Sequence, residues 1–505
     1  MVDGQPFLVL AGELHNNSAT SLEYMKPIWP RLAAMHLNTV LAPISWALLE
    51  PAEGQFDYTL VDGLIRDARS HHLRLVLLWF GSWKNTWSSY APDWVKRDFE
   101  RFPRVHLRNG TATERLSPFS EACFKADARA FAALMRRIRE VDGSVHTVIM
   151  VQVENEVGVI PDARDHSPAA NAAYDQPVPP ELLEYLRKHR DSLDPDLRTR
   201  WQSAGFKTSG NWEDVFGPGP YTEDLFMAWH YARYIGKVAE AGKTEYRLPM
   251  FANAALIRPD YAPGQYNSGG PLPHSIDIWR AGGPQLDFFA PDIYFEFKKW
   301  CAKYDRPGNP LFIPEAAGGA QGAANVFYAI GHHNAFGFSP FAIDAGEGDQ
   351  AIARSYGILS QLAPLILENQ AKSRVAAVLL EELTPSQRLR LGDYTFNISP
   401  AGGRRPAGAP PEPETAAAER PYGIFIASGP NEFYMAGSAL SIALTPNTPG
   451  PPMVGLATVE EGRFVEGRWL RGRTLAGDDT GQGNNITLRG GPNAGILRVT
   501  VYRYQ

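Results

Sequence analysis

Two glutamates close apolar, strand-like stretches that lie far apart in the sequence. Glu156 ends the run IMVQVENEVG (149–158), and Glu315 ends PLFIPEA (310–316). An unpartnered carboxylate is costly to bury, so an acid at such a position needs a partner or a chemical task. Two carboxyls about 5–5.5 Å apart can act as nucleophile and acid/base in a retaining glycosidase, whereas a gap of roughly 6.5–9.5 Å fits inversion. Sequence spacing leaves that separation open.

Eight short β-rich runs alternate with helical stretches between residue 7 and about residue 345. The runs are 7–12, 38–46, 74–80, 147–155, 249–254, 287–294, 310–316 and 336–343. Such alternation predicts a closed parallel (β/α)8 TIM barrel, an α/β fold with its active site at the carboxyl ends of the strands. Strands four and seven would then carry Glu156 and Glu315 across the mouth from each other.

The fourth run has polar and apolar residues in alternation. Gln152, Glu154 and Glu156 are expected on one face, toward the barrel interior, and the valines at 151 and 153 on the other, toward helices. We interpret Glu154 as a salt-bridged core carboxylate that supports the site from one layer deeper. Glu156 comes last and would emerge at the rim.

The chain is divided by two long insertions and by a change in sequence pattern near residue 370. Residues 81–120 and 157–220 follow strands three and four and would stand over the mouth of a barrel spanning 1–370. Residues 371–505 consist of short alternating strands with Gly and Asn turns, which predicts a smaller all-β sandwich or jelly roll. A Pro/Gly/Ala-rich stretch, 399–421, should interrupt it as a mobile surface loop.

Bulk composition excludes several classes. A net charge of −6 gives no reason to expect a nucleic-acid partner, and no run of about 18 apolar residues predicts a membrane span. Cys123 and Cys301 are expected to be buried free thiols, although one bridge between them stays open. No cofactor or metal is expected, because neither phosphate-binding glycine loops nor His/Cys/acid clusters at metal spacing occur.

Several motifs together resemble glycoside hydrolase family 35, the β-galactosidases of the clan A retaining glycosidases. They are GELHN (12–16), LNTV with EPAEGQFDY (37–58), PDW (92–94) and QVENEVG (152–158). The similarity spans about residues 7–345, and the later β-module looks like one carried by a bacterial branch of that family. The chain departs from the family at Pro43 and at 83–85, positions that would touch the non-reducing sugar.

The resemblance implies a role for each matching residue. Glu156 would be the acid/base, which must hold a proton, and Glu315 the nucleophile, which must stay ionised. Asn155 would hold the sugar 2-hydroxyl, and Tyr294 would lie against the nucleophile. The residues expected to contact substrate are Asn155, Tyr294, Trp83, Lys84, Asn85, His15, Asn16, Trp46 and Asn253.

The resemblance thus favours a retaining exo-β-galactosidase that acts on oligosaccharides or plant polysaccharide side chains, xyloglucan among them. Open alternatives are another glycoside (a β-glucoside, glucosaminide or arabinoside) and a carbohydrate-binding protein without catalysis. The oligomeric state is open, with a homodimer one option. If a signal peptide has been removed the protein would be periplasmic or secreted, and otherwise cytoplasmic.

Overall fold

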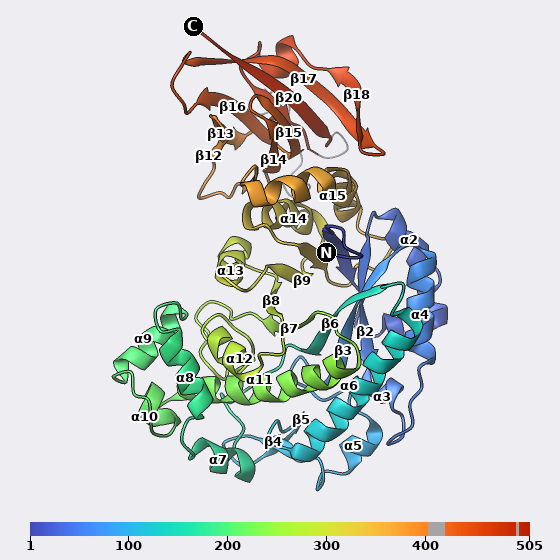
Figure 1. The fold of residues 1–505 in the computed structure, drawn as a ribbon, viewed down its shortest axis with the longest axis vertical. Coiled ribbons are helices and arrows are strands. Elements are labelled where there is room, and N and C mark those ends of the chain that lie inside the picture. Colours follow the sequence, from blue (N-terminus) through green and yellow to red (C-terminus); the bar gives the residue numbers. More distant parts are fainter. Residues whose placement is uncertain (402–419, 491–493) are drawn as a thin grey trace, which may run out of the picture. The chain divides into compact units, whose positions relative to one another are not determined.

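The computed structural model describes residues 1–401, 420–490 and 494–505. Most of the predicted loop 399–421 lies outside the described residues. Figure 1 shows the course of the chain. Contacts group it into two compact units: Gly12–Pro30 with Asn38–Glu315, and Met1–Ala11 with Arg31–Leu37 and Ala316–Gln505. The predicted boundary at 370 stays a prediction.

Eight strands close into a parallel barrel in the order β1-β10-β9-β8-β7-β6-β3-β2, which confirms the predicted TIM barrel (Figure 1). Each corresponds to one of the eight predicted runs. Their bounds are β1 (Val9–Glu13), β2 (Thr39–Ser45), β3 (Arg74–Lys84), β6 (Val148–Asn155), β7 (Met250–Ala255), β8 (Phe288–Ile293), β9 (Phe312–Ala316) and β10 (Gly337–Pro340).

Two long helices cover β3 and β6 (Figure 1). Helix α6 (Glu121–Asp142) begins where the Ser120 side chain accepts a hydrogen bond from the backbone of Cys123, and α11 (Pro220–Glu245) begins with a proline in its first turn. The two helices pack closely because Gly242 has no side chain: a Cβ there would lie 2.3 Å from the Phe131 ring.

The other helices around the barrel are shorter. They are α1 (Leu22–Met25), α2 (Ile28–Ala34), α3 (Trp46–Leu49), α4 (Thr59–Ser70), α12 (Ile276–Gly282), α13 (Phe297–Tyr304), α14 (Gly319–His333) and α15 (Gln350–Asn369), with 3-10 turns at Ser18–Thr20 and Gln370–Lys372.

Both predicted insertions are folded segments. The first holds α5 (Asp93–Arg97) and a hairpin of β4 (Arg104–His106) and β5 (Ala112–Leu116). The second holds α7 (Pro168–Tyr174), α8 (Pro180–Lys188), α9 (Pro195–Ser203) and α10 (Trp212–Phe216). Its prolines have a structural reason: three of these four helices begin with one, where the ring fixes φ and no N–H is needed.

The C-terminal region is all-β, as predicted. A six-stranded sheet has the order β11-β14-β15-β20-β17-β18, and a four-stranded sheet has the order β12-β13-β16-β19. Phe396 of one sheet packs against Phe425 and Phe433 of the other, with ring centroids 5.5 and 5.2 Å apart. The bounds are β11 (Val375–Leu379), β12 (Gln387–Leu391), β13 (Tyr394–Pro400), β14 (Tyr422–Gly429), β15 (Glu432–Ser438), β16 (Leu440–Pro446), β17 (Met453–Val465), β18 (Arg468–Thr474), a 3-10 turn (Gly477–Thr480), β19 (Ile486–Leu488) and β20 (Ile496–Tyr504).

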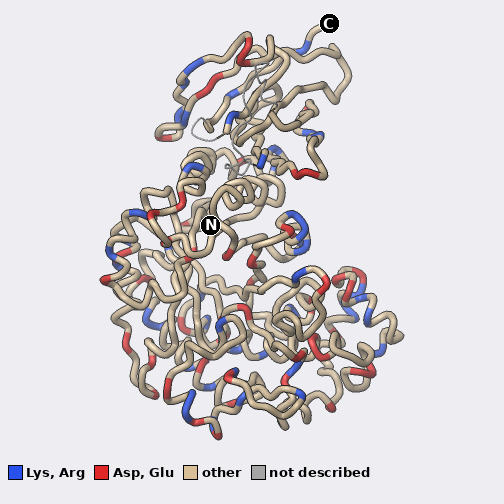
Figure 2. Tube along the Cα trace, turned by 180° about the vertical axis from the view of Figure 1, so that it is seen from behind, with Lys and Arg blue, Asp and Glu red and all other residues tan. Residues whose placement is uncertain are grey.

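Three bulk features can be checked in the described residues. Cys123 and Cys301 are free and buried, as predicted. None of the described helices is both long enough and apolar enough to cross a membrane. Lys and Arg are interspersed with Asp and Glu along the trace (Figure 2).

Candidate active site

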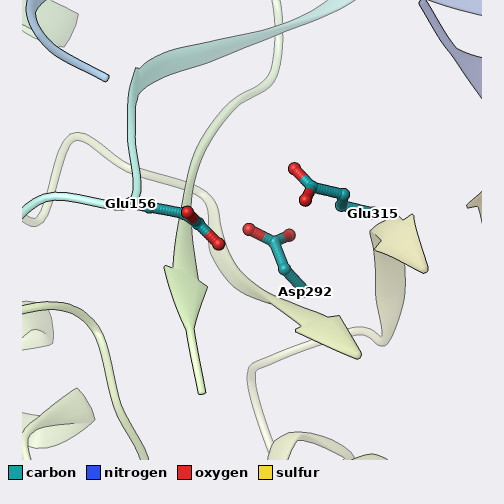
Figure 3. A group of neighbouring side chains, drawn as sticks. All are labelled: Glu156, Asp292 and Glu315. Atoms are coloured by element: carbon teal, nitrogen blue, oxygen red, sulfur yellow. The ribbon is translucent and has the colours of Figure 1, made fainter. Parts of the chain in front are cut away.

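Three buried carboxyls converge at the carboxyl ends of barrel strands. Glu156 follows β6, Asp292 lies near the end of β8, and Glu315 lies near the end of β9. One oxygen from each lies within 4.8 Å of the others, and Figure 3 shows the three side chains pointing toward a common point. The two glutamates singled out from the sequence therefore lie together, joined by an aspartate.

Hydrogen-bond donors surround Glu315. The Tyr294 hydroxyl donates to its Oε1 at 2.5 Å, the Glu13 carboxyl lies within hydrogen-bonding reach, and the Lys84 ammonium is close enough to act on its charge. Burial, and then the charge of Glu156, raise the pKa of Glu315 to about 7, while these three groups act in the opposite direction. No described residue hydrogen-bonds to Oε2, so this oxygen is left for a ligand.

The backbone of Glu156 is fixed from two sides. Its N–H donates to Asn253 Oδ1 at 3.0 Å, and its carbonyl accepts from Asn267 Nδ2 at 2.9 Å. Asn253 also donates through Nδ2 to Asp292 at 2.6 Å, so one amide holds two of the three acids in place. Asn253, expected to touch substrate, thus has both ends of its amide engaged by the protein.

Burial, reinforced by nearby acids, also raises the pKa of Glu13 and of Asp292 well above their usual range. The charges of Glu315 and Glu156 both act on Glu13 and on Asp292. Four acids and the Lys84 ammonium thus share one buried space. All four acids cannot be ionised there at once. Glu13 and Asp292, whose pKa values are raised well above the usual range, are therefore the natural holders of protons.

Asn155 is the best-placed of the predicted sugar contacts. Its side chain is buried, at 1% exposed, yet neither Nδ2 nor Oδ1 has a hydrogen-bond partner among the described residues. A buried amide without partners is costly, and a ligand with hydroxyl groups would satisfy both atoms.

The remaining polar candidates lie around this cluster. Lys84 is buried and donates to the exposed Asn85. His15 is exposed at the end of β1, and Asn16 beside it is half-buried, with an Oδ1 that no described residue satisfies.

Two predicted contacts, Trp83 and Trp46, have fully buried side chains, and their contact with substrate stays a prediction. The Trp83 indole donates to the carbonyl of Leu116 at 3.0 Å and packs edge-on against Tyr231 and Tyr234. The Trp46 indole donates to Glu50 at 2.8 Å. Both indoles lie in the protein core, where large aromatic side chains are common.

The expectation for Glu154 also needs correction. It is a buried carboxyl, but its oxygens accept from the backbone N–H groups of Ser82 and Trp83, at 3.1 and 2.6 Å, and it lies beside Asp127 of α6. It therefore points toward β3 and α6 and does not share the face of Glu156. Glu154 has φ +62° and Glu156 φ +44°, which breaks the strict alternation of an extended strand.

Sequence reasoning missed Glu13 and Asp292 as site residues. Both had a usable signal. Glu13 directly follows the first predicted run, and Asp292 lies two residues before Tyr294, so the period of two puts the side chains of Asp292 and Tyr294 on one face.

The Glu156, Asp292 and Glu315 oxygens are near enough to one another to hold a hard divalent cation. The nearby Lys84 ammonium already supplies positive charge at this position. The set contains no His or Cys, so it would suit neither zinc nor a redox metal.

Comparison with known proteins gives two family matches. Residues 21–239 match the glycoside hydrolase family 42 model, described as beta-galactosidase, and residues 352–487 match a domain of unknown function, DUF5597. A beta-galactosidase from Xanthomonas manihotis is 28% identical over 169 residues, which are 33% of this chain and 26% of that relative. The similarity to clan A β-galactosidases is thereby supported, whereas the expected assignment to family 35 is not.

The chain is also similar to solved structures. The cold-adapted β-galactosidase from Rahnella sp. R3 is 15% identical, with a TM-score of 0.49 over 72% of this chain and 57% of that one. The β-galactosidase from Bacillus circulans sp. alkalophilus is 14% identical, with a TM-score of 0.49 over 73% and 58%. The chain thus spans about a quarter of the curated relative and under two thirds of these structures.

Proposed function

We propose that this protein is a retaining exo-β-galactosidase with Glu315 as nucleophile and Glu156 as acid/base. The observation that carries the proposal is the approach of their carboxyl oxygens to within 4.8 Å at the strand ends. Retention needs a separation of about 5–5.5 Å, and inversion needs about 6.5–9.5 Å to admit a water between the acids. The short gap favours direct attack by a carboxylate.

The surroundings favour this division of labour. A nucleophile must be ionised, and the Tyr294 hydroxyl and the Lys84 ammonium both favour the ionised form of Glu315. In this assignment Glu156 carries the proton of the first step, and while it does so its charge no longer raises the pKa of Glu315.

The reaction would proceed in two displacements. Glu315 attacks the anomeric carbon while the bond to the leaving oxygen breaks, and Glu156 gives that oxygen its proton. Glu156, now a carboxylate, takes a proton from water, whose oxygen attacks the same carbon and releases Glu315. The unpartnered Asn155 amide would hold the 2-hydroxyl throughout.

Terminal β-linked galactose is the favoured substrate because the matched family and the curated relative are described as beta-galactosidases. Galactosylated plant oligosaccharides, such as xyloglucan fragments, are the expected natural substrates. Residues 83–85, which differ from the family pattern, lie beside the site and could change the sugar that is accepted. A panel of nitrophenyl β-glycosides should therefore include the glucoside, the glucosaminide and the arabinoside as well as the galactoside.

The test combines that panel with Glu315→Gln and Glu156→Ala. The first should abolish hydrolysis, and azide should restore Glu156→Ala by yielding β-galactosyl azide. Glu181→Gln, at an exposed position on α8, is the matched control and should keep full activity. Hydrolysis of another glycoside in preference to the galactoside would refute the sugar assignment, and full activity in Glu315→Gln would refute the mechanism.

A further inference from the structure

A tight turn at the end of β3 presents an exposed tryptophan. Lys84 and Trp87 form an antiparallel bridge, with the N–H of Lys84 donating to the Trp87 carbonyl at 2.8 Å and the N–H of Trp87 donating back at 3.0 Å. The two residues between them, Asn85 and Thr86, have φ +49° and +70°. A two-residue turn of this hand normally uses Asn-Gly, and a β-branched threonine at positive φ is an outlier.

The turn is fixed to the catalytic strand. The N–H of Asn85 donates to the carbonyl of Asn155 at 3.2 Å, so the turn lies beside the residue that precedes Glu156. Strained backbone of this kind is concentrated at binding sites, where the surrounding structure holds it in place.

Bridge geometry fixes the direction of the Trp87 side chain. Residues directly opposite each other in an antiparallel pair project from the same face, with Cβ atoms about 5 Å apart. Lys84 uses that face to bring its ammonium near Glu13 and Glu315. The Trp87 indole therefore rises from the side of the turn that faces the carboxyl cluster.

One face of the indole is covered and the other is open. The Arg115 guanidinium lies 4.0 Å from the Trp87 ring centroid and is held by its Nε–H, which donates to Thr86 Oγ1 at 3.0 Å. Arg115 is 3% exposed, whereas Trp87 is 46% exposed. A large apolar ring fixed in this way is a preformed flat surface, and its open face carries the negative side of the ring quadrupole.

We infer that Trp87 is the platform for the leaving sugar, so that the substrate class is β-galactosides whose leaving group is itself a sugar ring. The C–H groups on one face of a pyranose are weakly positive and match the open face of the indole. The ring is exposed and paired with Lys84, whereas the carboxyls are buried, so it is available to the unit next to the scissile bond. This inference rests on the proposed function and deepens it.

The test compares Trp87→Ala with wild type on two substrates. β-Galactosyl fluoride has no ring to stack, whereas a galactosyl disaccharide places a sugar against residue 87. We expect kcat/KM for the disaccharide to fall about tenfold and that for the fluoride to change less than about threefold. Trp87→Phe should keep most disaccharide activity, and Phe99→Ala, which removes another exposed ring from the same insertion, should change neither.

The outcomes separate the two proposals. If wild type cleaves neither substrate, the proposed function fails. If it cleaves both, an equal loss on both in Trp87→Ala, or no loss on either, overturns the platform.

Discussion

Replacing Lys84 with methionine removes the ammonium that acts on Glu13 and Glu315 and leaves a side chain of similar length. The pKa of Glu315 is already raised to about 7 by burial and Glu156, and Lys84 acts to lower it. Without Lys84 the carboxyl should hold its proton to higher pH. Because the proposed nucleophile works only when it is ionised, the activity of Lys84→Met should be lost at low pH and return as the pH rises.

The size of the effect follows from the charge removed. An opposite charge within about 4–6 Å lowers a carboxyl pKa by roughly 1–3 units, so the pKa of Glu315 should rise to roughly 8–10. At pH 7 the ionised fraction would fall from about one half to between roughly a tenth and a thousandth, a loss of roughly 5- to 500-fold in rate. The loss should shrink as the pH rises.

The assay is kcat/KM for β-galactosyl fluoride from pH 5 to 10, since fluoride leaves without a proton from Glu156 and the profile reports the nucleophile. Lys125→Met, at an exposed position on α6, is the matched control. A loss in Lys84→Met that is the same at every pH would refute the electrostatic reasoning and return Lys84 to the role of a plain sugar contact.

Three further predictions address single contacts. Tyr294→Phe removes a 2.5 Å hydrogen bond to Glu315 and should lower kcat/KM at pH 7 by roughly 10- to 150-fold; a change below about threefold would contradict it. Asn155→Ala should lower kcat/KM by about 100-fold on a galactoside and hardly at all on its 2-deoxy analogue, so equal losses would exclude a 2-hydroxyl contact. Burial raises the pKa of Glu154 well above its usual range, so its contribution to stability is full below the unfolded pKa of about 4.3 and is lost as pH rises through the folded pKa. Glu154→Gln keeps a donor toward Asp127 and does not titrate. Between pH 4.3 and the folded pKa, its free energy of unfolding should therefore rise relative to wild type by about 1.4 kcal/mol per pH unit in thermal unfolding. A difference in free energy that does not change with pH would contradict this.

The barrel could be predicted because its strands are short apolar runs whose character does not depend on distant residues. β6 is buried along its whole length, and the apolar composition of its sequence, VIMVQVEN, already indicates a buried strand. The proximity of Glu156 and Glu315 followed from topology, since the parallel strands of a closed barrel end at one rim. Charge state could not follow, because it depends on Glu13 and Lys84, which come from two other strands.

Aromatic residues show where local pattern fails. Trp83 and Trp87 lie four positions apart on one insertion and look equally suited to a sugar. Trp83 is buried against Tyr231 and Tyr234 of α11, a helix more than a hundred residues away, whereas Trp87 is exposed and has Arg115 against its ring. The difference lies in long-range packing, which periodicity does not contain.

The exit of β6 shows how a few dihedral angles change the chemistry. Had Glu154 kept an extended backbone, its carboxyl would have joined Glu156, Asp292 and Glu315 in the barrel and added a further charge to a buried cluster that Lys84 only partly balances. Positive φ at Glu154 turns this carboxyl out to the amides of Ser82 and Trp83. Those are the two residues just before Lys84, so the misplaced acid anchors the end of β3 that carries the ammonium to Glu315. The backbone turn at Glu154 thus keeps a further carboxyl out of the cluster and fixes the end of β3 that carries Lys84, and both effects favour an ionised Glu315.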